Sequence, residues 1–283
     1  MVNLKEYIKE SILDDEEVVF NDDNIKSEIE KFIEDNYNCD RLTISNKPNK
    51  DGKFVVDGGN IQVTNKNITS LTNNLFIWGK SGYFNCSHCD SLKSLEGAPK
   101  EASGYFNCSY CDSLKSLEGA SEKVGGDFIC SHCSSLTSLE GAPKEVGGNF
   151  ACSGCNSLKS LEGVPKKLIR IFNCSYCYSL TSLKGAPEEV GWDFDCSYCN
   201  SLTSLEGAPE KVGWDFSCSH CNSLKSLKGA PEKVGEGFSC THCKSLISLE
   251  GAPKKVGKTF LSIGNKFSIE DIKKVVKAKR IEI

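Results

Sequence analysis

Sixteen of the seventeen cysteines form eight C-x-x-C pairs, and these are the residues whose type and spacing could do chemistry. C-x-x-C is a half-site for Zn²⁺, so two neighbouring pairs could supply four thiolates, and the whole set could form an array of four-cysteine zinc sites. The motif also occurs in disulfides and in redox centres. Each pair begins 22 residues after the one before, at Cys86, Cys108, Cys130, Cys152, Cys174, Cys196, Cys218 and Cys240.

The context of the pairs favours packing over metal binding or redox chemistry. In the segment from Phe260, Ser262 and Asn265 stand where the two cysteines would be, so these positions accept small polar groups. The odd cysteine count and the absence of a secretory signal layout favour a reducing compartment, which argues against disulfides. A thioredoxin-like centre needs one exposed thiol at a helix N-terminus, whereas this motif recurs eight times. We expect reduced cysteines, no cofactor and no metal, with the zinc array as the less favoured alternative.

The histidines do not indicate an enzyme. Nothing in the sequence distinguishes one His-Cys pair from the others or supplies a third group to orient it, so no hydrolase triad is predicted. The glycine pairs Gly125-Gly126 and Gly147-Gly148 are not followed by the G-K-[ST] sequence of a phosphate-binding loop. All four histidines occupy one slot inside C-x-x-C, which contains His88, Tyr110, His132, Gly154, Tyr176, Tyr198, His220 and His242.

A fixed period of 22 residues predicts the elements that position the cysteines. A Phe stands two residues before every pair, from Phe84 to Phe238, and again at Phe260, and L-x-x-L follows each pair. Such self-similarity is typical of a solenoid, in which each unit buries its apolar side against the next. We expect one short strand per unit, stacked about 4.8 Å apart into one parallel β-sheet. The Gly and Pro of the return segment predict an extended, polyproline-like path.

Within this frame the repeat resembles the leucine-rich repeat family. Phe150 and Cys152 match its inward strand positions, Cys155 matches the position usually held by Asn or Cys, and Leu158 follows. The wording S-L-E-G-A-P-K-E-V-G-G is also similar to repeats in uncharacterised proteins of tailed bacteriophages. The resemblance implies a leucine-rich repeat fold with cysteine-containing repeats, encoded by a phage or mobile element and located in the host cytosol. It is specific for the fold and nearly silent on function.

The chain divides into three regions. Residues 1–58 are expected to form an N-terminal helical cap and connecting loop, 59–267 the leucine-rich repeat solenoid, and 268–283 a C-terminal capping helix. The solenoid contains an irregular first coil, the eight repeats and the final Ser/Asn coil. Apolar residues at helical spacing predict two helices in the N-terminal cap, one over residues 4–12 and one that follows Asp22 and Asp23 as N-cap candidates. Ser268 and Asp271 can cap the last helix, predicted to run to about Lys279 with Ile272, Val275 and Val276 covering the last coil.

Charge and hydropathy exclude several classes of partner. The 34 Lys and Arg against 38 Asp and Glu give a formal net charge of −4, so the chain has no global field that would attract nucleic acid or anionic membranes. The longest apolar runs fall far short of the roughly 18–20 residues of a membrane span. We expect a cytoplasmic protein with neither nucleic acid nor membrane as its partner.

The positions that vary between repeats are where a binding function would lie. Trp192 and Trp214 share a slot that other repeats fill with Gly, Arg, Glu or Lys, so both indoles are expected to be exposed and stacked about 5 Å apart. Asp193 and Asp215 follow them as an acidic rim, with Tyr178 and Tyr198 nearby. The alternative is that these rings only cover one another. The candidate binding residues are Trp192, Trp214, Asp193, Asp215, Tyr178, Tyr198, Tyr176, His220, His242, Tyr110 and His132.

These observations favour a non-enzymatic protein–protein interaction module. Its exposed sheet face is expected to bind a host or viral protein, because clustered Trp and Tyr are enriched at binding hot spots. The alternative is a structural component of a virion or particle, since the start MVNLKEYIKESILDDEE resembles the short amphipathic leaders of some phage head proteins. The sequence does not identify the partner.

Overall fold

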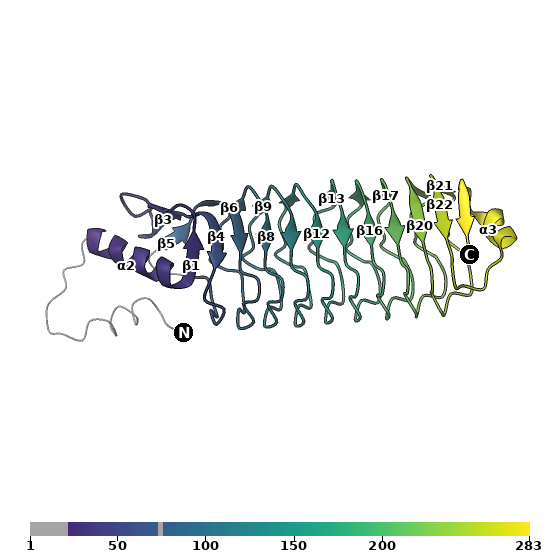
Figure 1. Cartoon of the computed structure of the whole chain (residues 1–283), viewed down its shortest axis with the longest axis horizontal. Coiled ribbons are helices and arrows are strands. Elements are labelled where there is room, and N and C mark those ends of the chain that lie inside the picture. Colours follow the sequence, from purple (N-terminus) through teal and green to yellow (C-terminus); the bar gives the residue numbers. More distant parts are fainter. Residues whose placement is uncertain (1–21, 73–75) are drawn as a thin grey trace.

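A computed structural model describes residues 22–72 and 76–283 as a β-solenoid of about 10 turns with little helix (Figure 1). The 22-residue period is therefore confirmed as one turn of the solenoid. The N-terminal segment lies outside the described residues, and with it the helix expected over residues 4–12. Two short helices lie near the ends of the solenoid, α2 (Asp22–Asn36) and α3 (Ile269–Val275).

The main sheet is a parallel, in-register ladder in which each Phe pairs with the Phe of the next turn, and we call it the Phe ladder. Phe150, for example, is opposite Phe128 on one side and Phe172 on the other. Its strands are β6 (Lys80–Asn85), β8 (Phe106–Asn107), β10 (Phe128–Ile129), β12 (Phe150–Ala151), β14 (Phe172–Asn173), β16 (Phe194–Asp195), β18 (Phe216–Ser217), β20 (Gly237–Ser239) and β22 (Thr259–Leu261).

The expected long parallel sheet is confirmed, but the return segments form a second parallel ladder, so the expectation of only one strand in each turn is wrong. Stacking copies of an extended segment at strand spacing brings their peptide groups into hydrogen-bonding register wherever the segment lies flat. We call this second set the return ladder. One part, β7 (Glu101–Ala102), β9 (Lys123–Val124) and β11 (Glu145–Val146), joins the main sheet through β6. The other is a separate sheet of β13 (Lys167–Leu168), β15 (Glu189–Val190), β17 (Lys211–Val212), β19 (Lys233–Val234) and β21 (Lys255–Val256).

The return ladder is interrupted between β11 and β13 by the side chain of Ile169. From Gly125 to Gly257 the other turns have Gly at this position, and a Cβ on Gly147 would lie less than 3.0 Å from the carbonyl oxygen of Gly125. Ile169 carries that Cβ, so its turn cannot approach the preceding one as closely. Gly147 and Gly191 donate backbone hydrogen bonds to the turn before them, and among the described residues Ile169 has no counterpart of these bonds. The Phe ladder continues across the interruption.

The solenoid interior consists of columns of Phe, Cys and Leu. From Cys111 onward, the second thiol of each pair donates to the carbonyl oxygen of the first Cys of the preceding turn, as from Cys155 Sγ to Cys130 O over 3.1 Å. In the last coil Asn265 Nδ2 donates to Cys240 O over 2.7 Å. An amide thus does in the last coil what a thiol does elsewhere, which confirms the packing role expected from this substitution. The phenylalanine rings are fully buried, with centroids about 5 Å from those of their neighbours.

The N-terminal end is closed by α2 and a set of short strands. Ile29 and Ile33 of α2 are buried against the core, as their spacing predicted, while Asp22 and Asp23 lie in the first turn of the helix. β1 (Tyr37–Cys39) pairs with β4 (Gly59–Val63), which starts the Phe ladder beside β6. β2 (Thr43–Ile44), β3 (Phe54–Asp57) and β5 (Phe76–Trp78) form a separate three-stranded sheet.

The C-terminal end differs from the expected single helix. The capping box of Ser268 and Asp271 is present, but α3 ends at Val275, and Arg280–Glu282 form a further parallel strand, β23, on β22. The open edge of β22 offers unpaired peptide groups, and the chain satisfies them by extending instead of continuing the helix. Ile272 and Val276 are buried as expected, whereas Val275 is 44% exposed.

Candidate functional site

Trp192 and Trp214 stack on each other at the start of two neighbouring turns. Their ring centroids are 4.8 Å apart and their planes differ by 5°, which confirms the expected stacking. Trp214 is 48% exposed, but Trp192 is only half-buried and not exposed as expected. The physical reason is the guanidinium of Arg170, which lies 4.9 Å from the ring centroid of Trp192 and covers its other face.

Two residues of this surface were missed by the sequence reasoning. Arg170 occupies the same slot as the tryptophans one turn earlier, and Ile169 beside it is 62% exposed. The signal for Ile169 was present, since it interrupts a column that is otherwise glycine from Gly125 to Gly257. We call the set of Ile169, Arg170, Trp192 and Trp214 the tryptophan surface. It combines two large apolar groups, a stacked cation and an exposed aliphatic side chain.

The acidic rim has a structural task that the sequence reasoning did not assign. Asp193 Oδ1 accepts a hydrogen bond from the backbone N–H of Asp215 over 3.1 Å, and Asp215 Oδ1 accepts one from Gly237 N–H over 2.7 Å. Asp127 and Asn149 make the same bond to the next turn. This slot therefore links successive turns, and its carboxylates are already hydrogen-bonded at one oxygen.

The His/Tyr column forms two runs of stacked rings in left-handed backbone. All seven His and Tyr of this slot have φ between 54° and 62°, a region that favours glycine, which explains why Gly154 fits there. The side chain of His132 lies over Gly154, which separates the two runs. The stacked pairs are His88–Tyr110, Tyr110–His132, Tyr176–Tyr198 and Tyr198–His220, with His220–His242 tilted.

The tyrosines and the tryptophans form two clusters instead of the expected single patch. Tyr178 contacts Tyr176 edge-on at 6.4 Å, and Tyr198 stacks on Tyr176 at 4.4 Å. Neither tyrosine makes a ring contact with an indole in the described part of the chain. The two-residue strand β16 lies between Trp192 and Tyr198, so the indole and the phenol ring lie on either side of this strand along the chain.

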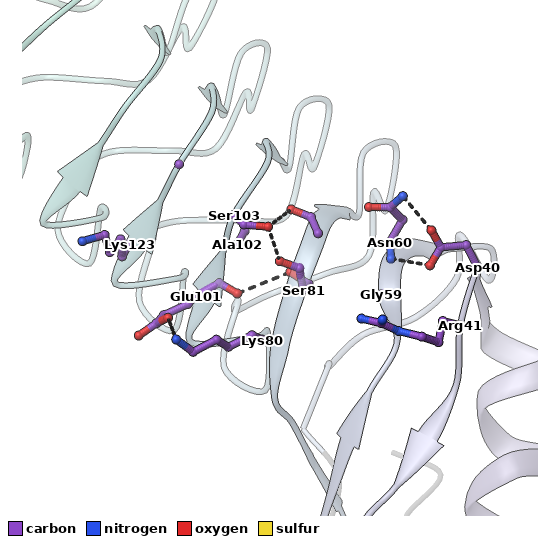
Figure 2. Close-up of a pocket in the computed structure, with 12 residues that line it drawn as sticks. Asp40, Arg41, Gly59, Asn60, Lys80, Ser81, Glu101, Ala102, Ser103 and Lys123 are labelled. Atoms are coloured by element: carbon purple, nitrogen blue, oxygen red, sulfur yellow. Dashed lines mark hydrogen bonds and ion pairs between the residues drawn. The ribbon is translucent and has the colours of Figure 1, made fainter.

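A groove of about 680 Å³ lies near the N-terminal end, where the return ladder branches from β6 (Figure 2). Its floor is made of small residues, and several of its polar groups bond to one another. Lys80 pairs with Glu101 at 2.7 Å, and Asn60 donates from both its backbone N–H and its Nδ2 to the Asp40 carboxylate over 2.7 Å. This arrangement is typical of a structural wall, and it does not bring together the residues expected to bind.

The cysteine columns do not assemble a metal site in residues 22–72 and 76–283. No group of three or more His, Cys, Asp or Glu there is placed to hold a metal ion. Burial raises the pKa of Cys130 well above the ordinary value and that of Cys133 to about 12. Zinc binds thiolates, and burial favours the neutral form of these two thiols.

Comparison of the chain with family models, curated proteins and solved structures gives no match. Within the described residues, no helix is long and apolar enough to cross a membrane.

Proposed function

We propose that the protein is a non-enzymatic interaction module that binds a protein partner through the tryptophan surface. The observation that carries this proposal is Trp214, whose indole is 48% exposed in a slot where four other turns have only glycine. Exposed indole contributes little to the core, whereas Trp and Arg are the residue types that dominate binding hot spots. The stack of Arg170, Trp192 and Trp214 holds these side chains in fixed positions, which lowers the entropy lost on binding.

The class of partner follows from the resemblance and from charge. Similarity to leucine-rich repeats and to tailed-phage repeat proteins supports a phage- or mobile-element-encoded protein whose partner is a host or viral protein. The unpaired, buried thiols fit the reducing host cytosol. A formal net charge of −4 supports a protein partner over nucleic acid or membrane. A structural role in a particle is the second candidate. It is favoured by the opposite net charges of α2 and of residues 254–283, because oppositely charged ends allow copies to assemble.

Site-specific photo-crosslinking in the native host tests this proposal. A benzophenone amino acid replaces Trp214 in one variant and Tyr105 in a matched control. Tyr105 also belongs to a stacked aromatic pair, with Tyr83 at 4.7 Å, but lies in the other half of the solenoid. We expect a discrete adduct with one protein from position 214 and none with that protein from position 105. The same adducts from both positions, or none from position 214, would show that the tryptophan surface is structural.

A further inference from the structure

The two ends of the solenoid carry opposite charge. α2 covers the N-terminal end with six Asp and Glu against two Lys, and Glu30 and Glu34 are exposed on it while Ile29 and Ile33 face the core. At the other end, residues 254–283 contain nine Lys and Arg against three Asp and Glu. Lys277, Lys279 and Arg280 are exposed there, beside α3 and β23. Figure 1 shows α2 and α3 at opposite ends of the long axis.

A column of charged residues along the return ladder ends in unopposed lysines. From the N-terminal side the column alternates in sign through Lys80, Glu101, Lys123, Glu145, Lys167, Glu189 and Lys211, and its ion pairs include Lys123–Glu145 at 2.6 Å and Lys211–Glu189 at 2.6 Å. The alternation then stops. Lys233 is directly opposite Lys255, and Lys255 is opposite Lys277. Like charges directly opposite one another destabilise a sheet, and within residues 22–72 and 76–283 these three lysines form none of the ion pairs that hold the rest of the column together.

We propose that copies of the chain associate head to tail, with the acidic outer face of α2 of one copy against the basic C-terminal end of the next. The carboxylates of α2 would supply ion-pair partners for Lys255 and Lys277. The two surfaces differ, so the contact is heterologous and leaves a free end on each side. The product is an open row of copies along the solenoid axis.

The chemistry of the basic end favours a protein face over a phosphate polymer. The groove beside the lysine column is lined by Lys233, Lys255 and Lys279, but also by Glu210 and Glu232. These carboxylates would repel a continuous run of phosphates. α2 instead presents carboxylates interspersed with Lys26 and Lys31, which matches a mixed surface. This inference does not rest on the tryptophan surface, which lies between the two ends.

Sedimentation velocity of the full chain at low and high salt tests the association. In about 50 mM salt we expect the mean mass to rise with concentration above the 30.9 kDa monomer. In about 500 mM salt we expect the monomer, because screening weakens contacts between exposed charges. A monomer at every concentration in low salt, or association that high salt does not weaken, would overturn the proposal.

Charge-reversal variants assign the contact to the two ends. Lys255→Glu/Lys277→Glu lowers the net charge of residues 254–283 from +6 to +2 and places two carboxylates at the contact, and Glu30→Lys/Glu34→Lys takes α2 from −4 to 0, so each variant alone should associate more weakly than the unchanged chain in low salt. A mixture of the two should associate more strongly than either variant alone, since the unchanged α2 of the first variant meets the unchanged basic end of the second. Recovery in the mixture also shows that both variants are folded. Failure of the mixture to associate would contradict a contact between the ends.

The matched control changes net charge by the same amount away from the ends. Lys115→Glu/Lys159→Glu replaces two exposed lysines in the middle of the solenoid. We expect it to associate within about twofold of the unchanged chain, whereas Lys255→Glu/Lys277→Glu should weaken association at least about tenfold. Equal loss in both variants would mean that net charge alone controls the association. Unchanged association in both would mean that the lysine column is not part of the contact.

Discussion

The turns before Ile169 and those after it share the same interior but differ in their surface. Phe, Cys and Leu continue through both regions, and the Phe ladder is unbroken. The slot that contains Gly82, Gly104, Gly126 and Gly148 in the first region contains Arg170, Trp192, Trp214, Glu236 and Lys258 in the second. In a solenoid of repeated turns the interior determines the fold, and the outer slots are free to differ. The large, exposed side chains are concentrated in the second region, which is where we place the binding surface.

The largest effect expected concerns the shared interior. Phe172→Ala should lower the free energy of unfolding by about 3–5 kcal/mol, because the ring is fully buried between Phe150 and Phe194 at 5.6 and 5.4 Å. Phe260→Ala should cost less, since Phe260 has one Phe neighbour and meets Ile281 of β23 on its other side. Urea titration measures both. An equal or larger loss at Phe260 would contradict an interior that depends on stacked rings.

Exchanging Gly and Ile at the interruption of the return ladder should move the interruption, because the side chain at this position decides whether neighbouring turns can pair. Gly147→Ile places a Cβ against Gly125 O, so it should break the backbone bonds of Gly147 and Gly148, both 2.9 Å, at a cost of about 1–3 kcal/mol. Ile169→Gly should instead allow β11 and β13 to pair. Amide hydrogen exchange reads out both changes, with faster exchange around Gly147 and slower exchange around residue 169. Unchanged protection at residue 169 would show that Ile169 does not cause the interruption.

The charged column predicts a smaller change of opposite sign in the two regions. Lys233→Glu restores the alternation and should raise the free energy of unfolding by about 0.2–1 kcal/mol. Lys123→Glu removes the ion pair with Glu145 and should lower it. Thermal unfolding in low and high salt measures both, and the two effects should shrink together at high salt. Destabilisation by Lys233→Glu would mean that the lysines do not repel one another in the fold.

The smallest effect expected is a pH dependence of the second run of stacked rings. Burial lowers the pKa of His220, with smaller contributions from His242 and Lys244. The unfolded chain therefore binds a proton at His220 more readily than the folded chain does. The contribution of His220 to the free energy of unfolding is complete above the ordinary pKa of 6.5 and decreases as the pH falls below it. His220→Tyr should reduce this slope in urea titrations between about pH 7 and pH 5. An unchanged slope would assign the pH dependence to other groups.

The interior columns of the structure were predictable from the sequence, whereas the return ladder and the last strand were not, because both depend on how neighbouring segments pair. Phe, Cys and Leu recur every 22 residues, so their columns follow from the period, and Asn265 in place of Cys indicated a position for small polar groups, which the structure shows to be a hydrogen-bonding one. The strand β23 was missed because it forms on the open edge of β22, a tertiary effect that no local pattern encodes.

The candidate site was predictable only in part, because some of its contacts depend on tertiary structure that no local sequence pattern encodes. The shared slot of Trp192 and Trp214 implied their stacking. The cover of Trp192 by Arg170 depends on side-chain conformation, which residue spacing does not determine. The hydrogen bonds of Asp193 and Asp215 were missed because an acidic residue beside an aromatic one suggested a rim, while the backbone of the next turn supplies the nearest donor.

The affinity of the crosslinked partner for two stacked-pair variants tests the central claim most directly. Trp192→Gly/Trp214→Gly introduces the residue that four other turns have in this slot, and Tyr83→Gly/Tyr105→Gly introduces the residue of Gly237 in theirs, so both should leave the fold intact. By titration calorimetry we expect the tryptophan variant to lose about 2–4 kcal/mol of binding free energy and the tyrosine variant to bind like the unchanged chain. Unchanged binding by the tryptophan variant, or equal losses in both, would contradict a binding surface centred on Trp192 and Trp214.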